Sequence, residues 1–159
     1  MIGFMGAGKT TVGRELARAL SCRFVDLDEL IEQRAGKAIR SIFAEQGEAE
    51  FRCIEREAIA ACSELNGAVI ALGGGAYVSE ENRAVLREIG KTVWLDCPLE
   101  VCLKRIGDDP SRPLLGNEDE MRDLLERRRE AYAQADYVVE SGKRSPSEIA
   151  CEIIALLKL

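Results

Sequence analysis

The N-terminal segment contains a glycine-rich pattern whose residue types suit phosphate binding. Residues 3–10 match G-x-x-x-x-G-K-[ST] and lead into an amphipathic helical pattern over residues 8–20. In such a loop, backbone N–H groups and the helix N-terminus surround a phosphate, while Lys9 can reach the β- and γ-oxygens and Thr10 can ligate Mg²⁺. The pattern therefore predicts a site for a nucleoside triphosphate and its magnesium ion. The alternative is a plain glycine turn.

Two carboxylates follow at the end of a β-rich run. Asp26 and Asp28 are two residues apart in the stretch that starts at Phe24. Both would lean toward the edge at which open α/β sheets bind ligands. Downstream of a phosphate loop, one carboxylate could order Mg²⁺ and the other could orient a reacting hydroxyl. The alternative is that Asp28 only N-caps a helix over residues 29–34.

Three consecutive glycines, Gly73, Gly74 and Gly75, follow the apolar run at residues 68–72. The strand ending in Asp that usually forms the second motif of phosphate-loop proteins is not found at this position. The glycines could simply make a turn, or they could leave bare backbone for contact with a ligand.

Arg128 lies inside an apolar helical stripe and should face inward. The stripe is formed by Met121, Leu124, Leu125, Tyr132 and Ala135. An inward guanidinium needs an anion, which is either a structural Asp or Glu or the carboxylate of a ligand. Spacing favours neither choice.

Two other arginines have simpler explanations. Arg52 is spaced for surface ion pairs with Glu48 and Glu55, and Arg112 lies in a segment at 107–117 that is rich in Gly, Pro and Asp. That composition predicts a mobile loop between two helices. A loop arginine is usually solvated, but in a phosphoryl-transfer enzyme it can close over the migrating charge.

An α/β framework is expected to position these residues. Short β-rich runs alternate with longer helical patterns, as is typical of parallel βαβ units. The expected strands are 23–26, 68–72, 92–96 and 137–140, and helical patterns cover 8–20 and 47–65. A last helix should begin at the capping sequence Ser145-Pro146-Ser147-Glu148, with Ile149, Ile153 and Leu156 on its apolar face.

The segment that leads into the phosphate loop is short. Only Met1 and Ile2 precede Gly3, whereas a strand of about five residues normally leads into such a loop. We therefore expect either that the chain is clipped or that its start is misplaced.

Composition excludes several classes of function. The 159 residues carry a net charge of −6 and no histidine, so neither a broad nucleic-acid surface nor an imidazole-based mechanism is expected. The six cysteines contain no C-x-x-C pair, and the longest apolar run is far shorter than a membrane span. We expect a single cytoplasmic domain with reduced thiols and no membrane partner.

Taken together, the motifs closely resemble the shikimate kinase family. The matching stretches are 3–14 (GFMGAGKTTVGR), 24–28 (FVDLD), 31–39 (IEQRAGKAI), 42–55 (IFAEQGEAEFRCIE), 72–76 (LGGGA), 112–115 (RPLL) and 128–132 (RREAY). The triple glycine and the FR-x-x-E segment are more specific than the phosphate loop, which many unrelated NTPases share.

The resemblance implies a fold and a reaction. The fold would be a P-loop NTPase-type α/β fold of the nucleoside-monophosphate-kinase kind, in which helices cover both faces of a five-stranded parallel sheet. The single domain (residues 1–159) would include a helical substrate-binding region at about 28–60 and a lid at about 107–117. The reaction would be ATP- and Mg²⁺-dependent phosphorylation of shikimate, carried out by a monomer.

The resemblance also implies residue roles. Lys9, Asp28 and Arg112 would be catalytic, and Thr10 and Asp26 would hold Mg²⁺. The ATP contacts would be Gly6, Ala7, Gly8, Lys9, Thr10, Thr11, Arg105, Arg112, Arg144 and Pro146. The shikimate contacts would be Asp28, Phe43, Phe51, Arg52, Gly73, Gly74, Gly75 and Arg128.

Two other functions are compatible with parts of the pattern. One is a kinase for another small hydroxy acid such as gluconate, which the substrate-side arginines would distinguish. The other is a nucleotide-binding module without turnover, which would tend to have lost Lys9, Asp28 or Arg112. All three residues are present, so an active enzyme is the preferred interpretation.

Overall fold

The computed structural model describes residues 1–107 and 117–159. The predicted lid, including Arg112, falls almost entirely outside this part of the chain. Within it, no helix combines the length and hydropathy needed to cross a bilayer. All six cysteines are free thiols.

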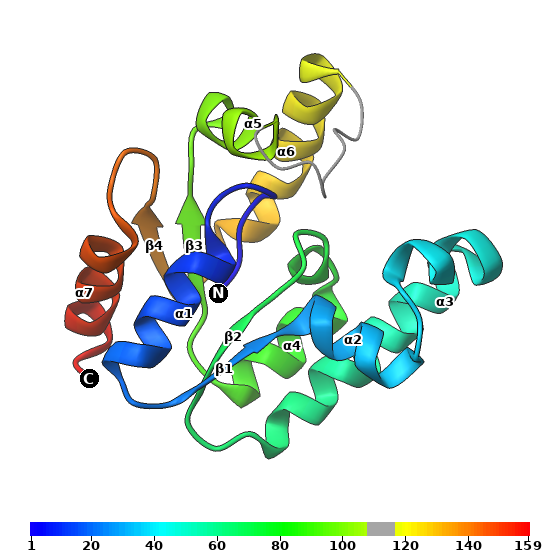
Figure 1. The fold of residues 1–159 in the computed structure, drawn as a ribbon, viewed down its shortest axis with the longest axis horizontal. Coiled ribbons are helices and arrows are strands. Elements are labelled where there is room, and N and C mark those ends of the chain that lie inside the picture. Colours follow the sequence, from blue (N-terminus) through cyan, green and yellow to red (C-terminus); the bar gives the residue numbers. More distant parts are fainter. Residues whose placement is uncertain (108–116) are drawn as a thin grey trace.

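Strands and helices alternate along the chain (Figure 1). The four strands agree with the sequence prediction to within one residue at each end. The strands are β1 (Arg23–Asp26), β2 (Ala68–Ala71), β3 (Val93–Asp96) and β4 (Tyr137–Glu140). The helices are α1 (Lys9–Ala19), α2 (Leu27–Ala35), α3 (Ile39–Ala61), α4 (Glu80–Ile89), α5 (Leu99–Gly107), α6 (Glu118–Tyr132) and α7 (Pro146–Leu157), with 3₁₀ turns at Cys62–Glu64 and Ala76–Val78.

The strands form two parallel pairs that the first two residues connect. β1 pairs with β2, and β3 pairs with β4. The Met1 amino group donates a hydrogen bond to Ile70 O, and Met1 O accepts one from Leu72 N, so Met1 extends the first pair. Ile2 forms a parallel bridge with Trp94 in β3 and extends the second pair. The central strand position is therefore occupied, but only by residues 1–2.

This arrangement corrects the predicted strand number. Five strands were expected, whereas the described residues contain four, in two sheets. The reason is that two residues before the phosphate loop supply ladder hydrogen bonds to both neighbours but are too few to count as a strand. The parallel direction of every pair agrees with the prediction.

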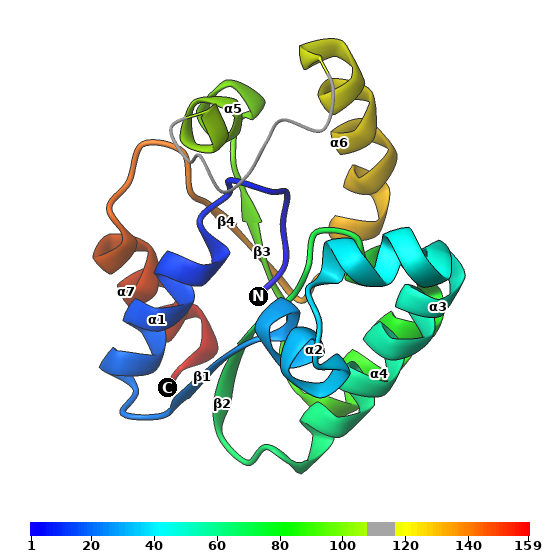
Figure 2. The same cartoon turned by 45° about the vertical axis from the view of Figure 1, so that its right-hand side comes forward.

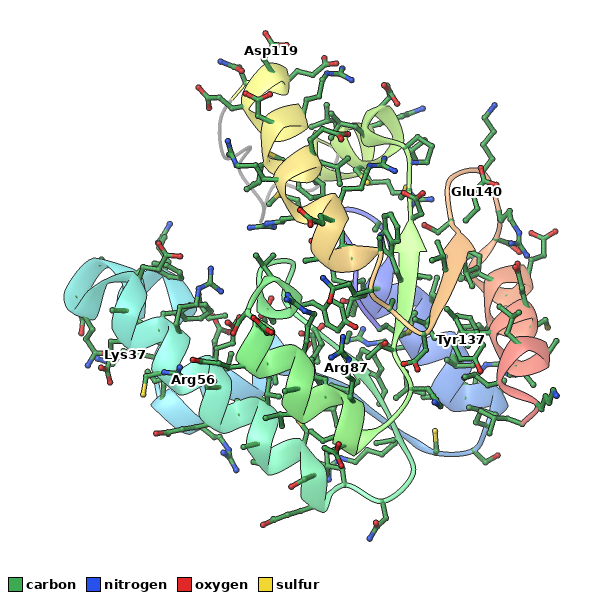
Figure 3. The ribbon with its side chains drawn as sticks, turned by 180° about the vertical axis from the view of Figure 1, so that it is seen from behind. Lys37, Arg56, Arg87, Asp119, Tyr137 and Glu140 are labelled. Atoms are coloured by element: carbon green, nitrogen blue, oxygen red, sulfur yellow. The ribbon has the colours of Figure 1, made fainter. Side chains whose placement is uncertain are left out.

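Helices cover the strands from both sides. α1 packs against α7 and against the β1–β2 pair, and the view from behind shows α3 and α4, marked by Arg56 and Arg87, in front of the strands (Figure 3). At the carboxyl ends of the strands, α2 and α3 follow β1 while α5 follows β3 (Figure 2). These helices therefore surround the edge at which the predicted site residues were expected.

Two helix predictions need correction. The pattern at 47–65 is part of a longer element that begins at Ile39 and is interrupted at Gly47, whose φ of 82° is not helical. Leu156, predicted for the apolar face of α7, is 38% exposed, whereas Ile149 and Ile153 are fully buried. The capping box at Ser145 and Glu148 is present as predicted.

The start of α2 decides the role of the first carboxylate. The N-cap is Asp26, whose side chain accepts a 3.1 Å hydrogen bond from Asp28 N. Asp28 is the second residue of the helix, within its first turn, so the alternative in which Asp28 itself is the N-cap is wrong. Its side chain therefore takes no part in capping and points toward the glycines at residues 73–75.

Candidate active site

A cavity of about 1030 Å³ opens at the carboxyl ends of β1 and β2, beside the N-terminus of α1. It is lined by residues from six separate segments of the chain. Most of the predicted site residues are among them. They are Gly6, Gly8, Lys9, Thr10, Thr11, Asp26, Asp28, Phe43, Phe51, Arg52, Gly73, Gly74, Gly75, Arg105 and Arg128.

The phosphate loop curves over the N-terminus of α1 because its glycines adopt left-handed conformations. Gly6 has a φ of 77°, and a Cβ atom there would lie 2.6 Å from Cys102 O. Gly8, the N-cap of α1, has a φ of 97°. Lys9 Nζ donates hydrogen bonds of 2.9 Å to both Gly3 O and Phe4 O. The loop therefore presents a helix N-terminus and an ammonium group to the cavity, as anion binding requires.

Thr10 and Asp26 meet beside this loop. Thr10 Oγ1 donates a 2.9 Å hydrogen bond to Asp26 Oδ2, although the two residues come from α1 and β1. Among the described residues, no group of three or more His, Cys, Asp or Glu side chains is arranged to hold a metal ion. Mg²⁺ binds hard oxygen donors and usually takes only one or two protein ligands in addition to substrate phosphates and water. The pair fits such an ion.

The glycine turn (residues 73–75) is compact because charged side chains occupy the space that its own side chains would need. A Cβ atom on Gly73 would lie 2.7 Å from Asp28 Oδ1. On the next two glycines the nearest atoms would be Arg128 Nη1 and Arg52 Nη2, each at 3.0 Å. The turn thus brings together three functional candidates, and its glycines are required for their close approach to the backbone.

Arg52 is held by a buried carboxylate and by an exposed one. Its Nη1 lies 2.9 Å from Glu55 Oε2 and its Nη2 lies 3.1 Å from Glu48 Oε1. The Glu55 side chain is only 3% exposed, whereas that of Glu48 is 69% exposed. The prediction of a surface ion-pair ladder is therefore wrong for Glu55, which lines the cavity wall.

Burial raises the pKa of Glu55, and the Arg52 ion pair only partly opposes this effect. The charges of Asp28 and Arg128 also act on this carboxyl group, which indicates how closely the four ionisable groups are gathered. Glu55 was missed as a site residue. Its spacing of four residues from Phe51 and three from Ala58, both buried, could have revealed it.

Arg128 and Tyr132 approach the turn from α6. Arg128 lies partly buried in the cavity wall, with its Cζ 5.9 Å from the centre of the Phe4 ring. Tyr132 is fully buried and donates a 2.5 Å hydrogen bond to Gly74 O. The inward direction predicted for Arg128 agrees with this placement.

An apolar wall faces these charges. The rings of Phe43 and Phe51 lie 4.5 Å apart, and the Arg52 guanidinium lies 5.2 Å from the centre of the Phe51 ring. Ile39 lines the same side of the cavity. A ligand here would meet aromatic surface on one side and charged groups on the other.

The remaining predicted ATP contacts lie at the rim or beyond it. Arg105 donates hydrogen bonds to Gly6 O at 3.2 Å, Ser141 O at 3.3 Å and Gly142 O at 3.0 Å, and so ties the phosphate loop to the 141–142 segment. Arg144, which directly precedes the N-cap of α7, pairs with Glu152 in the middle of that helix. Ala7, Arg144 and Pro146 are not among the cavity-lining residues, and their contact with nucleotide stays a prediction.

A family model described as shikimate kinase matches residues 5–158. This chain belongs to the shikimate kinase family. Shikimate kinases from Moorella thermoacetica and Persephonella marina are 46% and 42% identical to it, over 99% of this chain and 92% and 97% of their own lengths. Membership at this level assigns shikimate kinase activity, which uses ATP.

Solved structures agree with this membership. The shikimate kinase from Acinetobacter baumannii, in complex with shikimate, superposes with a TM-score of 0.92 at 38% identity, covering 99% of this chain and 90% of that one. The shikimate kinase from Aquifex aeolicus gives 0.87 at 41% identity, covering 99% and 94%. A gluconokinase from Sinorhizobium meliloti gives 0.65 at 19% identity, which shows a common fold alone.

Proposed function

We propose that this chain transfers the γ-phosphoryl group of ATP to the 3-hydroxyl of shikimate, with Mg²⁺, at the cavity described above. The observation that carries the proposal is the glycine turn, where Asp28, Arg52 and Arg128 converge within one cavity that also contains the phosphate loop. An acidic group for a hydroxyl and two cations for a carboxylate are the features that a hydroxy acid acceptor requires.

On the nucleotide side, the backbone of residues 6–11 and the N-terminus of α1 bind the phosphates of ATP. Lys9 then exchanges its contacts with loop carbonyls for the β- and γ-oxygens. Thr10 would ligate Mg²⁺, and Asp26 would help to hold it through water. The ion would supply positive charge that offsets the charge of the phosphates.

Asp28 is the group closest to the reacting hydroxyl in this proposal. Its carboxylate lies against Gly73 at the end of β2, so it can accept the proton of a hydroxyl that points toward the phosphate loop. Phosphoryl transfer needs little more from the protein than position and charge. A single well-placed carboxylate is therefore sufficient, and the absence of histidine from the chain is no obstacle.

The carboxylate of shikimate is bound by the two guanidinium groups. Arg128 and Arg52 reach the turn from α6 and α3, and the Gly74 and Gly75 backbone completes the contact. Their planar forks suit bidentate recognition of a carboxylate. Phe43 and Phe51 supply the apolar wall for the ring.

We assign the outer ATP contacts to Arg105, Arg112, Arg144 and Pro146, with Arg112 closing over the transferred group. This part of the proposal rests on the sequence resemblance. We further propose that the enzyme acts as a cytoplasmic monomer without nucleic-acid or membrane partners, in keeping with its net charge of −6 and free thiols.

The test is coupled ADP release with three acceptor conditions, namely shikimate, gluconate and none. We expect release that depends on both shikimate and Mg²⁺, and phosphorus NMR should place the new ester on the 3-hydroxyl. Lys9→Ala should abolish turnover, since it removes the cation that meets the β- and γ-oxygens. Faster turnover with gluconate than with shikimate would contradict the proposed acceptor.

A further inference from the structure

The middle carbonyl of the glycine turn is held differently from its neighbours. Gly73 O and Gly75 O accept backbone hydrogen bonds of 3.1 Å from Ala76 N and Val78 N. Gly74 O instead accepts the 2.5 Å bond from the Tyr132 hydroxyl, which comes from a helix 58 residues away in sequence. The Tyr132 side chain therefore holds the Gly74 peptide, whose carbonyl accepts no backbone hydrogen bond from the described residues that follow it.

The need for such a bond follows from the residue type. Glycine has no Cβ atom and can rotate about φ and ψ over a wide range, so three in a row form an intrinsically flexible segment. A rigid hydrogen-bond donor at the middle residue removes much of that freedom before a ligand binds. Preorganisation of this kind lowers the ordering cost of binding.

The donor is placed on the same helix as a proposed substrate contact. Tyr132 follows Arg128 by four residues, so the two side chains project from the same face of α6. Both reach Gly74, because Arg128 Nη1 lies 3.0 Å from the position of its missing Cβ and the Tyr132 hydroxyl lies 3.7 Å from it. The hydrogen bond thus fixes the distance between the turn and the guanidinium.

We infer that Tyr132 is a positioning residue for acceptor binding: its hydroxyl holds the Gly74 peptide at the spacing from Arg128 that a substrate carboxylate needs. The inference rests on the proposed function, in which Arg128 and the Gly74 backbone bind the carboxylate of shikimate. Burial also raises the pKa of the Tyr132 phenol, so the hydroxyl stays protonated and remains a donor at neutral pH.

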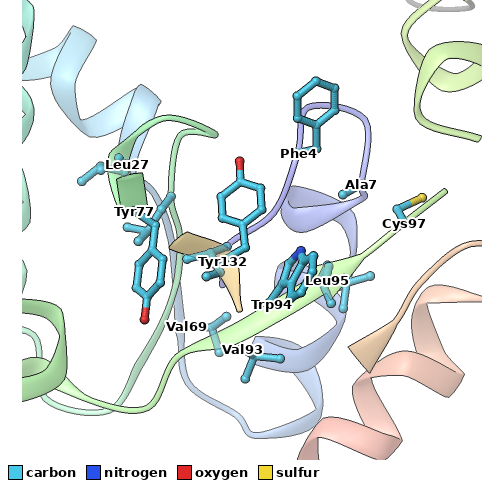
Figure 4. Close-up of a cluster of buried hydrophobic side chains, with 14 of the residues drawn as sticks. Phe4, Ala7, Leu27, Val69, Tyr77, Val93, Trp94, Leu95, Cys97 and Tyr132 are labelled. Carbon is cyan, nitrogen blue, oxygen red and sulfur yellow. The ribbon is translucent and has the colours of Figure 1, made fainter. Parts of the chain in front are cut away.

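The chain offers a matched control in Tyr77. This tyrosine is also fully buried, and its hydroxyl also donates to a backbone carbonyl, Gln134 O, at 3.2 Å. Figure 4 shows the hydroxyl groups of Tyr77 and Tyr132 pointing in opposite directions within the same cluster. Replacing either residue by Phe removes one buried hydroxyl and keeps the ring, but only the Tyr132 bond ends on the turn.

The experiment compares wild-type enzyme, Tyr132→Phe and Tyr77→Phe by steady-state kinetics and thermal melting. For Tyr132→Phe we expect the KM for shikimate to rise by about threefold to tenfold, the range for one lost hydrogen bond. The KM for ATP and kcat should change less than about twofold. Tyr77→Phe should lower the Tm and leave both KM values unchanged.

Each outcome decides the inference. Because KM does not depend on the fraction of folded enzyme, a partly unfolded variant still reports on positioning. An unchanged KM for shikimate in an active Tyr132→Phe enzyme, with a Tm decrease like that of Tyr77→Phe, would show a purely structural role and overturn the inference alone. Wild-type enzyme without shikimate-stimulated ADP release would overturn the proposed function, and this inference with it.

Discussion

Glu55 combines burial with an ion pair, and the two influences act in opposite directions on its carboxyl group. Burial favours the neutral acid, while Arg52 at 2.9 Å favours the carboxylate. Burial outweighs pairing, so the pKa lies above the usual value for glutamate. The guanidinium proposed to bind substrate is therefore held by a partner that acid can neutralise.

A pH dependence follows from this residue. As pH falls through the raised pKa, Glu55 becomes protonated and Arg52 loses its buried counter-charge. The KM for shikimate should therefore begin to rise at a higher pH than it would if Glu55 had the pKa of an ordinary glutamate. Protonation of Glu55 has a different effect on stability, because it increases the free energy of unfolding. The folded state binds this proton more tightly than the unfolded state, so the contribution of Glu55 to that free energy decreases as pH rises from the unfolded pKa through the raised one.

Glu55→Gln tests both statements, and Glu48→Gln is the matched control. Glu55→Gln should raise the KM for shikimate at neutral pH and flatten its pH profile, since the amide cannot titrate. Glu48→Gln removes only the exposed partner of Arg52, which is worth little in solvent, and should keep the wild-type profile. Identical pH profiles for wild type and Glu55→Gln would contradict the assignment.

Arg128 gives a second prediction at the residue scale. Loss of a bidentate, charge-assisted contact from a partly desolvated site costs about 2–4 kcal/mol, so Arg128→Ala should weaken shikimate binding at least about tenfold by calorimetric titration. Arg128→Lys should rescue little, because an ammonium group is a point charge and not a fork. Arg127→Ala is the control, since Arg127 is exposed and does not line the cavity.

The competing interpretation of Arg128 is structural. If its role were to neutralise a protein carboxylate, Arg128→Ala would lower the Tm while the folded protein bound shikimate with wild-type affinity. The same titration, accompanied by a thermal melt of each variant, separates these possibilities.

At the scale of the elements, sequence periodicity predicted the strands well but could not predict how their loops meet. The runs at 23–26 and 137–140 match β1 and β4 because short β-rich segments bounded by turn residues have few other solutions. The element containing Gly47 was predicted less well, since a single glycine does not reveal whether it ends a helix or bends one. The φ of 82° at Gly47 is one that glycine adopts readily.

The candidate site, too, was predictable from the sequence only in part. The phosphate loop and the two aspartates were recognisable because their spacing is local. The burial of Glu55 and the hydrogen bond from Tyr132 to Gly74 depend on contacts between α3, α6 and the end of β2. Periodicity can place a residue on a buried face, but it cannot say which backbone that face meets.

The glycine turn leads to a prediction at this scale. Gly73→Ala would place a methyl group 2.7 Å from the present position of Asp28 Oδ1, so the carboxylate must move away from the turn. Because small displacements of a reacting group can cost up to about a hundredfold in rate, we expect kcat to fall by at least about tenfold. The clash involves the end of the Asp28 side chain and not backbone atoms, so folding should persist.

Gly90→Ala provides the control for that experiment. Gly90 also follows an element end, but a Cβ atom there would meet nothing within 4 Å. Its Tm and kcat should match the wild type. A Gly73→Ala enzyme with wild-type kcat would show that the exact place of Asp28 is unimportant for turnover.

At the scale of the whole molecule, the two strand pairs are joined both by backbone and by side chains. Met1 and Ile2 carry ladder hydrogen bonds toward β2 and β3. The apolar core is continuous across the junction and includes Ile2, Leu72 and Leu95. Side-chain packing and these hydrogen bonds therefore join the two pairs together.

The partly buried position of Met1 has a practical consequence for attaching the protein to a column or a sensor surface. A peptide fused before Met1 would begin beside a 210 Å³ hollow, which is lined by Met1, Gly67, Ala68, Lys91 and Thr92, near the backbone that begins β2 and β3. A linker rich in valine and isoleucine should pair there and raise the Tm, whereas a glycine–serine linker should not. A tag placed after Leu159, which is 68% exposed, should leave the Tm unchanged. Differential scanning fluorimetry of the three fusions would check this, and equal Tm values for all of them would mean that the hollow does not accept strand.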